Sequence, residues 1–129
     1  MRRFIAAVAL AALATTANAS EWKKVGESSS VGDLLADMDS VTRTGDTVSV
    51  WLEWPTYHSN YDPRVASALM QTKFYCRPRE FELFNMIVKD KDANVLFNMT
   101  DDEGRKGAQA NTTFSHALEI LCAATEQQH

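Results

Sequence analysis

Two cysteines place the strongest constraint on what this chain can fold into. Only Cys76 and Cys122 occur, and Cys122 lies in the last apolar segment of the sequence, residues 115–125. This segment follows the i, i+3, i+4, i+7 spacing of an amphipathic α-helix, with one face formed by Leu118, Leu121, Cys122 and Thr125. Because each cysteine has only the other as a partner within the chain, a disulfide between them would fix a C-terminal helix to the middle of the chain.

The N-terminus has the three parts of a secretory signal peptide. Two arginines at positions 2 and 3 precede an unbroken apolar run over residues 4–14, and small or polar residues follow up to Ala-Asn-Ala at 17–19. The apolar run is too short to span a bilayer, and a helix without a polar face is hard to bury in so small a domain. We therefore predict a signal peptide at residues 1–19. Because no cysteine lies near its end, we do not expect a lipid anchor at that position.

Cleavage after Ala19 would leave residues 20–129, the length of one ordinary domain. Of the 13 basic residues, Arg2 and Arg3 would be removed, so 11 would remain against 17 acidic residues, a net charge of −6. An acidic chain without a basic stripe is unsuited to nucleic acid or anionic lipid. The remaining sequence has no apolar segment of membrane-spanning length. We expect one exported domain that does not insert into the membrane and whose partner is another protein.

Export also sets the expected state of the cysteines. Thiols are oxidised in the periplasm and outside the cell, so we predict a disulfide between Cys76 and Cys122. The alternative is a free catalytic cysteine, but neither residue lies in a known local Cys-His motif.

The middle of the chain has the pattern of antiparallel strands. The clearest strand is 48–54, where every second residue is apolar and the expected core face consists of Val48, Val50, Leu52 and Trp54. Further strands are predicted at 22–25, 33–36, 66–76, 79–89 and 95–99, and the polar segment 37–41 favours a helical turn. With the helix at 115–125, capped by Ser115, this predicts an α+β fold. Its small antiparallel sheet has about five to six strands, and the helix packs on the sheet and is tethered by the disulfide.

Trp51 does not fit the simple alternation of strand 48–54. Its large aromatic side chain is expected on the face of Ser49 and Glu53, opposite the core face. One interpretation is that a second layer covers this face, either the C-terminal helix or the other subunit of a dimer. The other interpretation is that Trp51 contacts a ligand or partner directly. Trp51 is therefore a candidate binding residue.

Residues 56–64 form the longest irregular stretch between two predicted strands and contain Tyr57, His58 and Tyr61. Loops bear binding residues more often than strands do, and tyrosines mixed with serine and asparagine are typical of adaptable protein-binding loops. The alternative is a hairpin extension whose tyrosines are exposed without a role. Tyr57, His58 and Tyr61 are accordingly candidate protein-binding residues.

The remaining polar patterns fall short of metal or catalytic motifs. Asp90, Asp92 and Asn94 have the spacing of the first ligands of a calcium loop. However, Val95 occupies the position that needs glycine, and Asp101 the position that needs glutamate, so a polar hairpin turn explains the same residues. No histidine ligand spacing, phosphate-binding glycine loop or nucleophile motif occurs. We expect no metal site, no cofactor, no catalytic residues and no enzyme activity.

Short motifs are distributed over nearly the whole predicted domain: Trp22, Asp39-Ser40-Val41, Arg43-Thr44-Gly45-Asp46, Val48-Ser49-Val50-Trp51, Cys76 followed by Arg77 and Arg79, and Leu121-Cys122. In these motifs the chain resembles the surface-adhesin protein E family of Gram-negative bacteria. The resemblance implies an antiparallel sheet with a disulfide-held C-terminal helix, often as a homodimer. It also implies binding of host matrix and plasma proteins. The adhesin that gives the family its name is a lipoprotein, and this chain lacks the lipid-attachment cysteine.

Two functions are compatible with these features. The first is an exported, non-enzymatic protein-binding module that engages a host matrix or plasma protein, or an envelope protein. The second is a structural or accessory envelope component of the periplasm that acts as a homodimer. Fold resemblance alone does not decide between them, because similar folds serve different functions.

Overall fold

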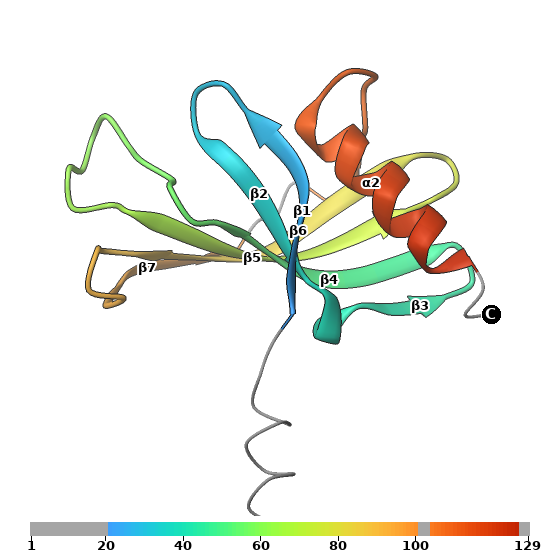
Figure 1. The fold of residues 1–129 in the computed structure, drawn as a ribbon, viewed down its shortest axis with the longest axis horizontal. Helices are drawn as coiled ribbons and strands as arrows, with labels where there is room; N and C mark the ends of the chain where they lie inside the picture. Colours follow the sequence, from blue (N-terminus) through green and yellow to red (C-terminus); the bar gives the residue numbers. More distant parts are fainter. Residues whose placement is uncertain (1–20, 101–103, 127–129) are drawn as a thin grey trace, which may run out of the picture.

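A computed structural model describes residues 21–100 and 104–126 of the chain. The predicted signal peptide, residues 1–19, lies outside the described residues, and so does Asp101. Within the described ranges, no helix is long and apolar enough to cross a membrane. The described part consists of one antiparallel sheet with a single long helix against it (Figure 1).

The elements follow one another as strands and then a helix. The strands are β1 (Trp22–Ser28), β2 (Gly32–Asp37), β3 (Thr42–Thr44), β4 (Thr47–Trp54), β5 (Ser67–Tyr75), β6 (Glu80–Lys89), β7 (Val95–Thr100) and β8 (Lys106–Gly107). The helices are the 3-10 helix η1 (Met38–Ser40) and the α-helix α2 (Thr113–Ala124). The predicted α+β fold is confirmed: every predicted strand is present, and the structure adds the short β3 and β8.

The sheet has the strand order β1-β2-β4-β5-β6-β7, and all neighbouring strands are antiparallel. The short β3 pairs with β4, and β8 pairs with β6. The sheet is strongly curled, so that β1 and β2 rise beside α2 (Figure 1). β1 and β7 are therefore the two end strands of this order, and the short β3 and β8 each pair with one strand only.

Burial along β4 alternates over the full strand, as its sequence predicted. Val48, Val50, Leu52 and Trp54 are buried, and the residues between them are half buried. The buried face joins a core that includes Val25, Leu34, Phe74, Leu118 and Leu121. Because each buried aliphatic side chain contributes about 1.5–3 kcal/mol relative to exposure, this shared core is what holds α2 on the sheet.

α2 begins at Thr113, earlier than the predicted start at Ser115. Its N-cap is Thr112, whose hydroxyl oxygen accepts a hydrogen bond from the main-chain N–H of Ser115 at 3.2 Å. The prediction that Ser115 caps the helix was therefore wrong. Phe114 packs among core aromatic rings, so its burial favours an additional turn at the start of the helix. Ser115 is buried instead, and its hydroxyl oxygen accepts a hydrogen bond from Arg79 at 2.9 Å.

The predicted disulfide between Cys76 and Cys122 is confirmed, with an S–S distance of 2.05 Å and Cα atoms 6.0 Å apart. It joins the residue after β5 to the last turn of α2. Leu118 and Leu121 are buried as predicted, whereas Cys122 is half buried at the margin of the apolar stripe. The disulfide thus closes the end of the core rather than its centre.

Candidate functional site

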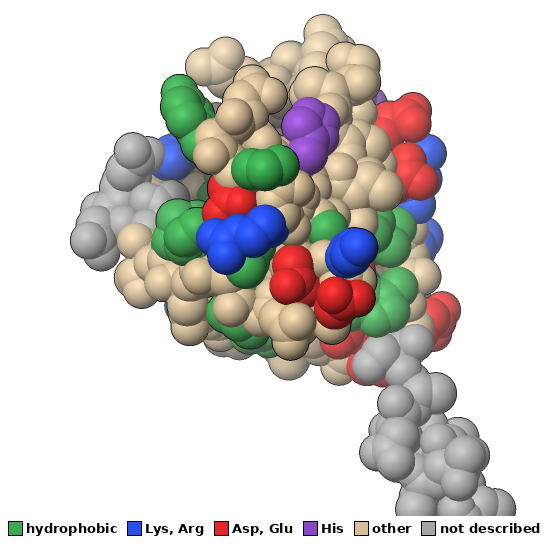
Figure 2. Space-filling model, turned by 90° about the vertical axis from the view of Figure 1, so that its left-hand side faces the viewer, with side chains coloured by type: hydrophobic (Ala, Val, Ile, Leu, Met, Phe, Trp, Pro, Cys, Tyr) green, Lys and Arg blue, Asp and Glu red, His purple; other side chains and the backbone are tan. Residues whose placement is uncertain are grey.

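Three of the four candidate binding residues lie in the β4–β5 loop, residues 55–66. Tyr61 projects into solvent with 98% of its surface exposed, and His58 is exposed as well. Tyr57 is half buried and packs against the core. Figure 2 looks onto this end of the molecule, where acidic and basic side chains lie beside one another among hydrophobic ones. The loop therefore presents Tyr61 and His58 to solvent and is anchored by Tyr57.

The second half of this loop is fixed by polar contacts. Arg64 donates hydrogen bonds to both carboxylate oxygens of Asp62, at 3.0 Å from Nε and 2.8 Å from Nη2. These bonds hold the pKa of Asp62 below its ordinary value. The main-chain N–H of Ala66 donates to the carbonyl oxygen of Lys89 at 2.8 Å. The end of the loop is thus tied to β6, and the exposed Tyr61 lies earlier in the same loop.

The turn between β6 and β7 lies beside the loop and explains the calcium-like spacing. Oδ1 of Asp90 accepts hydrogen bonds from the main-chain N–H groups of Asp92 and Asn94, each at 2.9 Å. The bond from Asn94 is the main reason that the pKa of Asp90 is lowered. The carboxylate of Asp90 is therefore used to close the turn. Within residues 21–100 and 104–126, no group of three or more His, Cys, Asp or Glu side chains could hold a metal ion.

Trp51 lies apart from the loop residues, on the outer face of the sheet. Its cross-strand partner is Gln71, and its main-chain N–H donates to the hydroxyl oxygen of Ser40 at 3.0 Å. α2 packs on the opposite face, where Phe114 contacts the ring of Trp54 with centroids 6.5 Å apart. The interpretation that the C-terminal helix covers Trp51 was therefore wrong, because alternation fixes which residues share a face but not which face the helix takes.

Trp51 is one member of a wider apolar surface. The register places Leu35 and Leu69 opposite Glu53, and Ile87 opposite Leu69, so all of them share the outer face with Trp51. Each of the four apolar side chains is half buried. We call this surface the outer patch, and it comprises Leu35, Trp51, Leu69 and Ile87.

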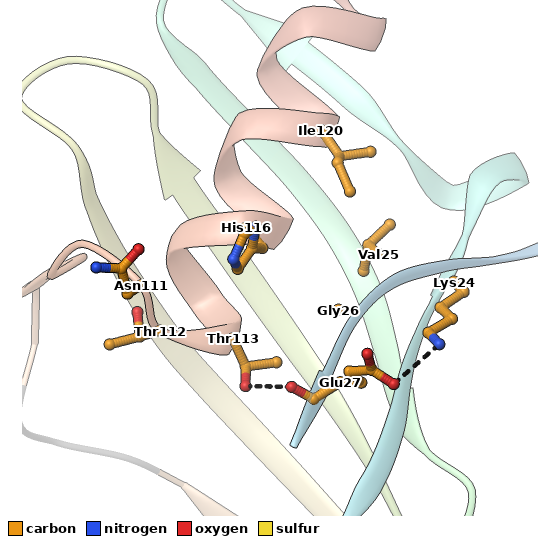
Figure 3. Close-up of a pocket in the computed structure, with 9 residues that line it drawn as sticks. All are labelled: Lys24, Val25, Gly26, Glu27, Asn111, Thr112, Thr113, His116 and Ile120. Atoms are coloured by element: carbon orange, nitrogen blue, oxygen red, sulfur yellow. Dashed lines mark hydrogen bonds and ion pairs between the residues drawn. The ribbon is translucent and has the colours of Figure 1, made fainter. Parts of the chain in front are cut away.

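A pocket of about 440 Å³ lies between β1 and the start of α2 (Figure 3). Val25 and Ile120 approach each other at its inner side, and Lys24, Glu27 and His116 lie at its rim. Its volume falls in the range of small-molecule sites. However, Lys24 pairs with Glu27 at 3.1 Å, and the hydroxyl of Thr113 donates to the main-chain oxygen of Glu27 at 3.0 Å. The first contact lies within β1 and the second joins α2 to β1, and neither defines a particular ligand.

Comparison with known proteins identifies the family. The family model for surface-adhesin protein E matches residues 22–123, which is most of the chain. The chain belongs to the surface-adhesin protein E family. A search of curated protein sequences gave no match. The family expected from the short motifs is confirmed.

Two solved structures share the protein E fold with this chain. The selenomethionine form of Haemophilus influenzae protein E has a TM-score of 0.59 at 11% identity, with 84% of this chain and 90% of the other covered. A second structure of Haemophilus influenzae protein E has a TM-score of 0.53 at 14% identity, with 70% and 77% covered. At these identities the likeness concerns the fold.

Sequence reasoning missed one surface of this protein E family member. Val95, Phe97 and Met99 on β7 have exposed fractions of 58%, 44% and 47%. The alternation of Phe97 and Met99 predicted a strand correctly. However, side chains alternate every two residues in central and edge strands alike, so the pattern does not tell which kind β7 is. Only the strand order, with β7 at the end of the sheet, reveals that their apolar side chains stay exposed.

Proposed function

We propose that this member of the surface-adhesin protein E family is a non-enzymatic module that binds another protein through the β4–β5 loop. Family membership supports an adhesin-like surface protein. The proposed partner is a host matrix or plasma protein, or a protein of the bacterial envelope. The observation that supports this site best is the nearly complete exposure of Tyr61 on a loop whose following residues are fixed by hydrogen bonds.

Tyr61 would be stabilised by contact with a partner. Each Å² of its apolar surface that a partner removes from water contributes roughly 25 cal/mol to binding. Tyrosine is also among the residues that dominate the binding energy of protein interfaces. Because Asp62, Arg64 and Ala66 already fix the chain next to Tyr61, binding there orders few additional residues.

The test is quantitative binding of the purified protein to immobilised matrix, plasma and envelope proteins. We expect Tyr61→Ala to weaken the strongest interaction by about tenfold or more, as for a binding hot spot. Trp22→Ala is the matched control, because Trp22 is an exposed aromatic residue on the distant strand β1. Equal binding by the wild type and Tyr61→Ala would remove the loop as the binding site.

The alternative function is a structural or accessory envelope component that acts as a homodimer. The outer patch supports it, because its four half-buried apolar side chains lie on the sheet face opposite α2. Sedimentation of the wild type and of Trp51→Ala tests this function. A wild-type dimer that Trp51→Ala converts to a monomer would support it, and a monomeric wild type would exclude it.

We also propose that residues 1–19 are a signal peptide and that the remaining chain works as a single domain, in the periplasm or outside the cell. The order of arginines, apolar run and Ala-Asn-Ala supports export. Mass spectrometry of the protein recovered from the periplasm and medium tests it. A chain that starts at Ser20 is expected, and an intact Met1 in the recovered protein would refute cleavage.

A further inference from the structure

The β7 edge has the properties of a strand that can accept another strand. β7 is the last strand of the described sheet, and β8 pairs with β6 rather than with β7. Its six residues include no charged side chain. Three of them, Val95, Phe97 and Met99, are exposed large hydrophobic residues. Long, uncharged and apolar edge strands offer unpaired main-chain groups for pairing with another chain.

The opposite edge, β1, is protected in three ways. It contains Lys23, Lys24 and Glu27, and charged side chains are a common means of blocking an edge. Its register shifts between Lys24 and Gly26, which interrupts regular pairing. The side chain of Thr113 on α2 bonds to the main-chain oxygen of Glu27, so the helix covers part of the edge. Among residues 21–100 and 104–126, the β1 edge is thus protected and the β7 edge is left open.

The faces of β7 specify the side chains that an added strand would need. Phe97 pairs with Val88 and Met99 with Met86, both of which belong to or pack against the core. The contacts of α2 with the sheet are made mainly to β1 and β5, so the helix leaves this part of the core face uncovered. Apolar side chains on an added strand would therefore cover Phe97 and Met99. Residues of the added strand that lie beside Asn98, on the other face of the sheet, would remain in water.

The size and charge of this edge indicate the kind of occupant. Six residues span about 20 Å, and with a sheet thickness of about 10 Å the edge offers only about 200 Å². Stable dimers usually bury roughly 800 Å² of each partner, so the β7 edge fits the smaller contact of one added segment better than an interface between two copies of this chain. A charged side chain placed against Phe97 and Met99 would lose its hydration without a counter-charge.

We propose that β7 binds an extended, uncharged segment of a partner protein by strand addition, with apolar residues of that segment at alternate positions against Phe97 and Met99. Main-chain hydrogen bonds supply the affinity, and the alternate side chains supply the specificity. This site is separate from the β4–β5 loop and does not depend on the loop being a binding site.

The experiment uses a phage-displayed library of random ten-residue peptides selected on the whole purified protein. Recovered peptides are expected to alternate apolar and polar residues and to lack charge at their centre. Met99→Lys should weaken their binding by about tenfold or more, because it places a charge on the edge. Trp22→Lys is the matched control on β1 and should leave binding unchanged, as should Tyr61→Ala in the loop.

A second measurement separates strand addition from side-chain contact. The best peptide is N-methylated at odd or at even positions, and we expect one set to abolish binding while the other retains it, because alternate N–H groups point toward β7. Equal tolerance of both sets, or equal binding to Met99→Lys, would overturn the proposal. Recovery of no peptide would also overturn the proposal. A wild-type dimer that Met99→Lys dissociates would do so as well, because it would show that β7 binds a second copy of this chain.

Discussion

Nη1 of Arg43 donates a hydrogen bond to the main-chain carbonyl oxygen of Cys122 at 2.9 Å. Only 7% of the Arg43 side chain is exposed, and it also donates to the hydroxyl oxygen of Thr125 at 3.2 Å and to the carbonyl oxygen of Gly45 at 2.8 Å. Cys122 is in turn bonded to Cys76. The last turn of α2 is therefore held by both a disulfide and a buried cation, which bonds to one of the carbonyl groups at the C-terminal end of the helix.

The first prediction concerns the disulfide. Its cysteines are separated by 46 positions, so removal in a Cys76→Ser, Cys122→Ser variant should lower the free energy of unfolding by about 4 kcal/mol on the chain-entropy model. Urea unfolding of both proteins without reductant measures this. The exported wild type should also react with no thiol reagent when denatured without reductant. Two labelled cysteines per chain would contradict the disulfide.

The second prediction concerns Arg43. Arg43→Met keeps the length of the side chain but removes the donors to Cys122 and Thr125, so we expect a loss of about 2 kcal/mol in the free energy of unfolding. Arg77→Met is the matched control, because Arg77 is close to the same disulfide but has 86% of its side chain exposed. A similar small loss in both variants would show that the hydrogen bonds of Arg43 do not hold the helix end.

The third prediction concerns the close contact of β1 with α2. A Cβ atom added at Gly26 would lie 2.8 Å from Cγ2 of Thr113 and 3.2 Å from its carbonyl oxygen, whereas a Cβ at Gly107 meets nothing within 4 Å. Gly26→Ala should therefore displace the start of α2 and cost about 1–3 kcal/mol, as overpacking does. Gly107→Ala should be nearly neutral. Equal thermal unfolding of the two variants would show that α2 adjusts freely at this contact.

Sequence reasoning predicted the features that depend on local pattern. Alternation identified the core face of β4 through Val48 and Val50, and the disulfide followed from there being two cysteines and an export signal. It failed for the features that depend on packing between segments that are distant in the sequence. Arg43 lies 79 positions from Cys122, and nothing in the residues around Arg43 indicates that it pairs with the end of a helix.

The same limit applies to the candidate binding surfaces. The composition of the β4–β5 loop pointed to Tyr61, and the structure places Tyr61 in solvent. Trp51 was assigned to the correct face of β4, but the face taken by α2 depends on the curl of the whole sheet. Phe97 and Met99 were assigned to a strand, but their exposure depends on strand order, which a single sequence does not encode locally.

The fourth prediction concerns the stability contributed by Trp51. Full burial of a large aromatic residue makes its truncation to alanine cost about 3–5 kcal/mol, so half burial on the outer face should reduce the cost to about 2 kcal/mol. Urea unfolding of Trp51→Ala at low protein concentration measures the contribution of the single chain. A loss that rises toward the value for full burial as the protein concentration is increased would mean that a second copy covers the outer patch, which is the homodimer alternative.

The last prediction is a loss of stability in acid that originates at the β6–β7 turn and the adjoining loop. The pKa values of Asp90 and Asp62 are both lowered from 3.8 in the folded chain, by the main-chain N–H of Asn94 and by the Arg64 side chain respectively. A carboxyl group with a lowered pKa stabilises the fold above its unfolded pKa and loses that contribution as the pH falls through the folded pKa. The stabilisation that these two groups provide should therefore be complete and independent of pH near neutrality, and it should be lost as the pH falls below about 4. Asp90→Asn keeps an oxygen acceptor for the turn but cannot titrate, so its stability should fall less steeply in acid than that of the wild type. Urea unfolding from neutral pH to about pH 2 measures both proteins, and identical slopes below pH 4 would show that the turn is not a source of the acid sensitivity.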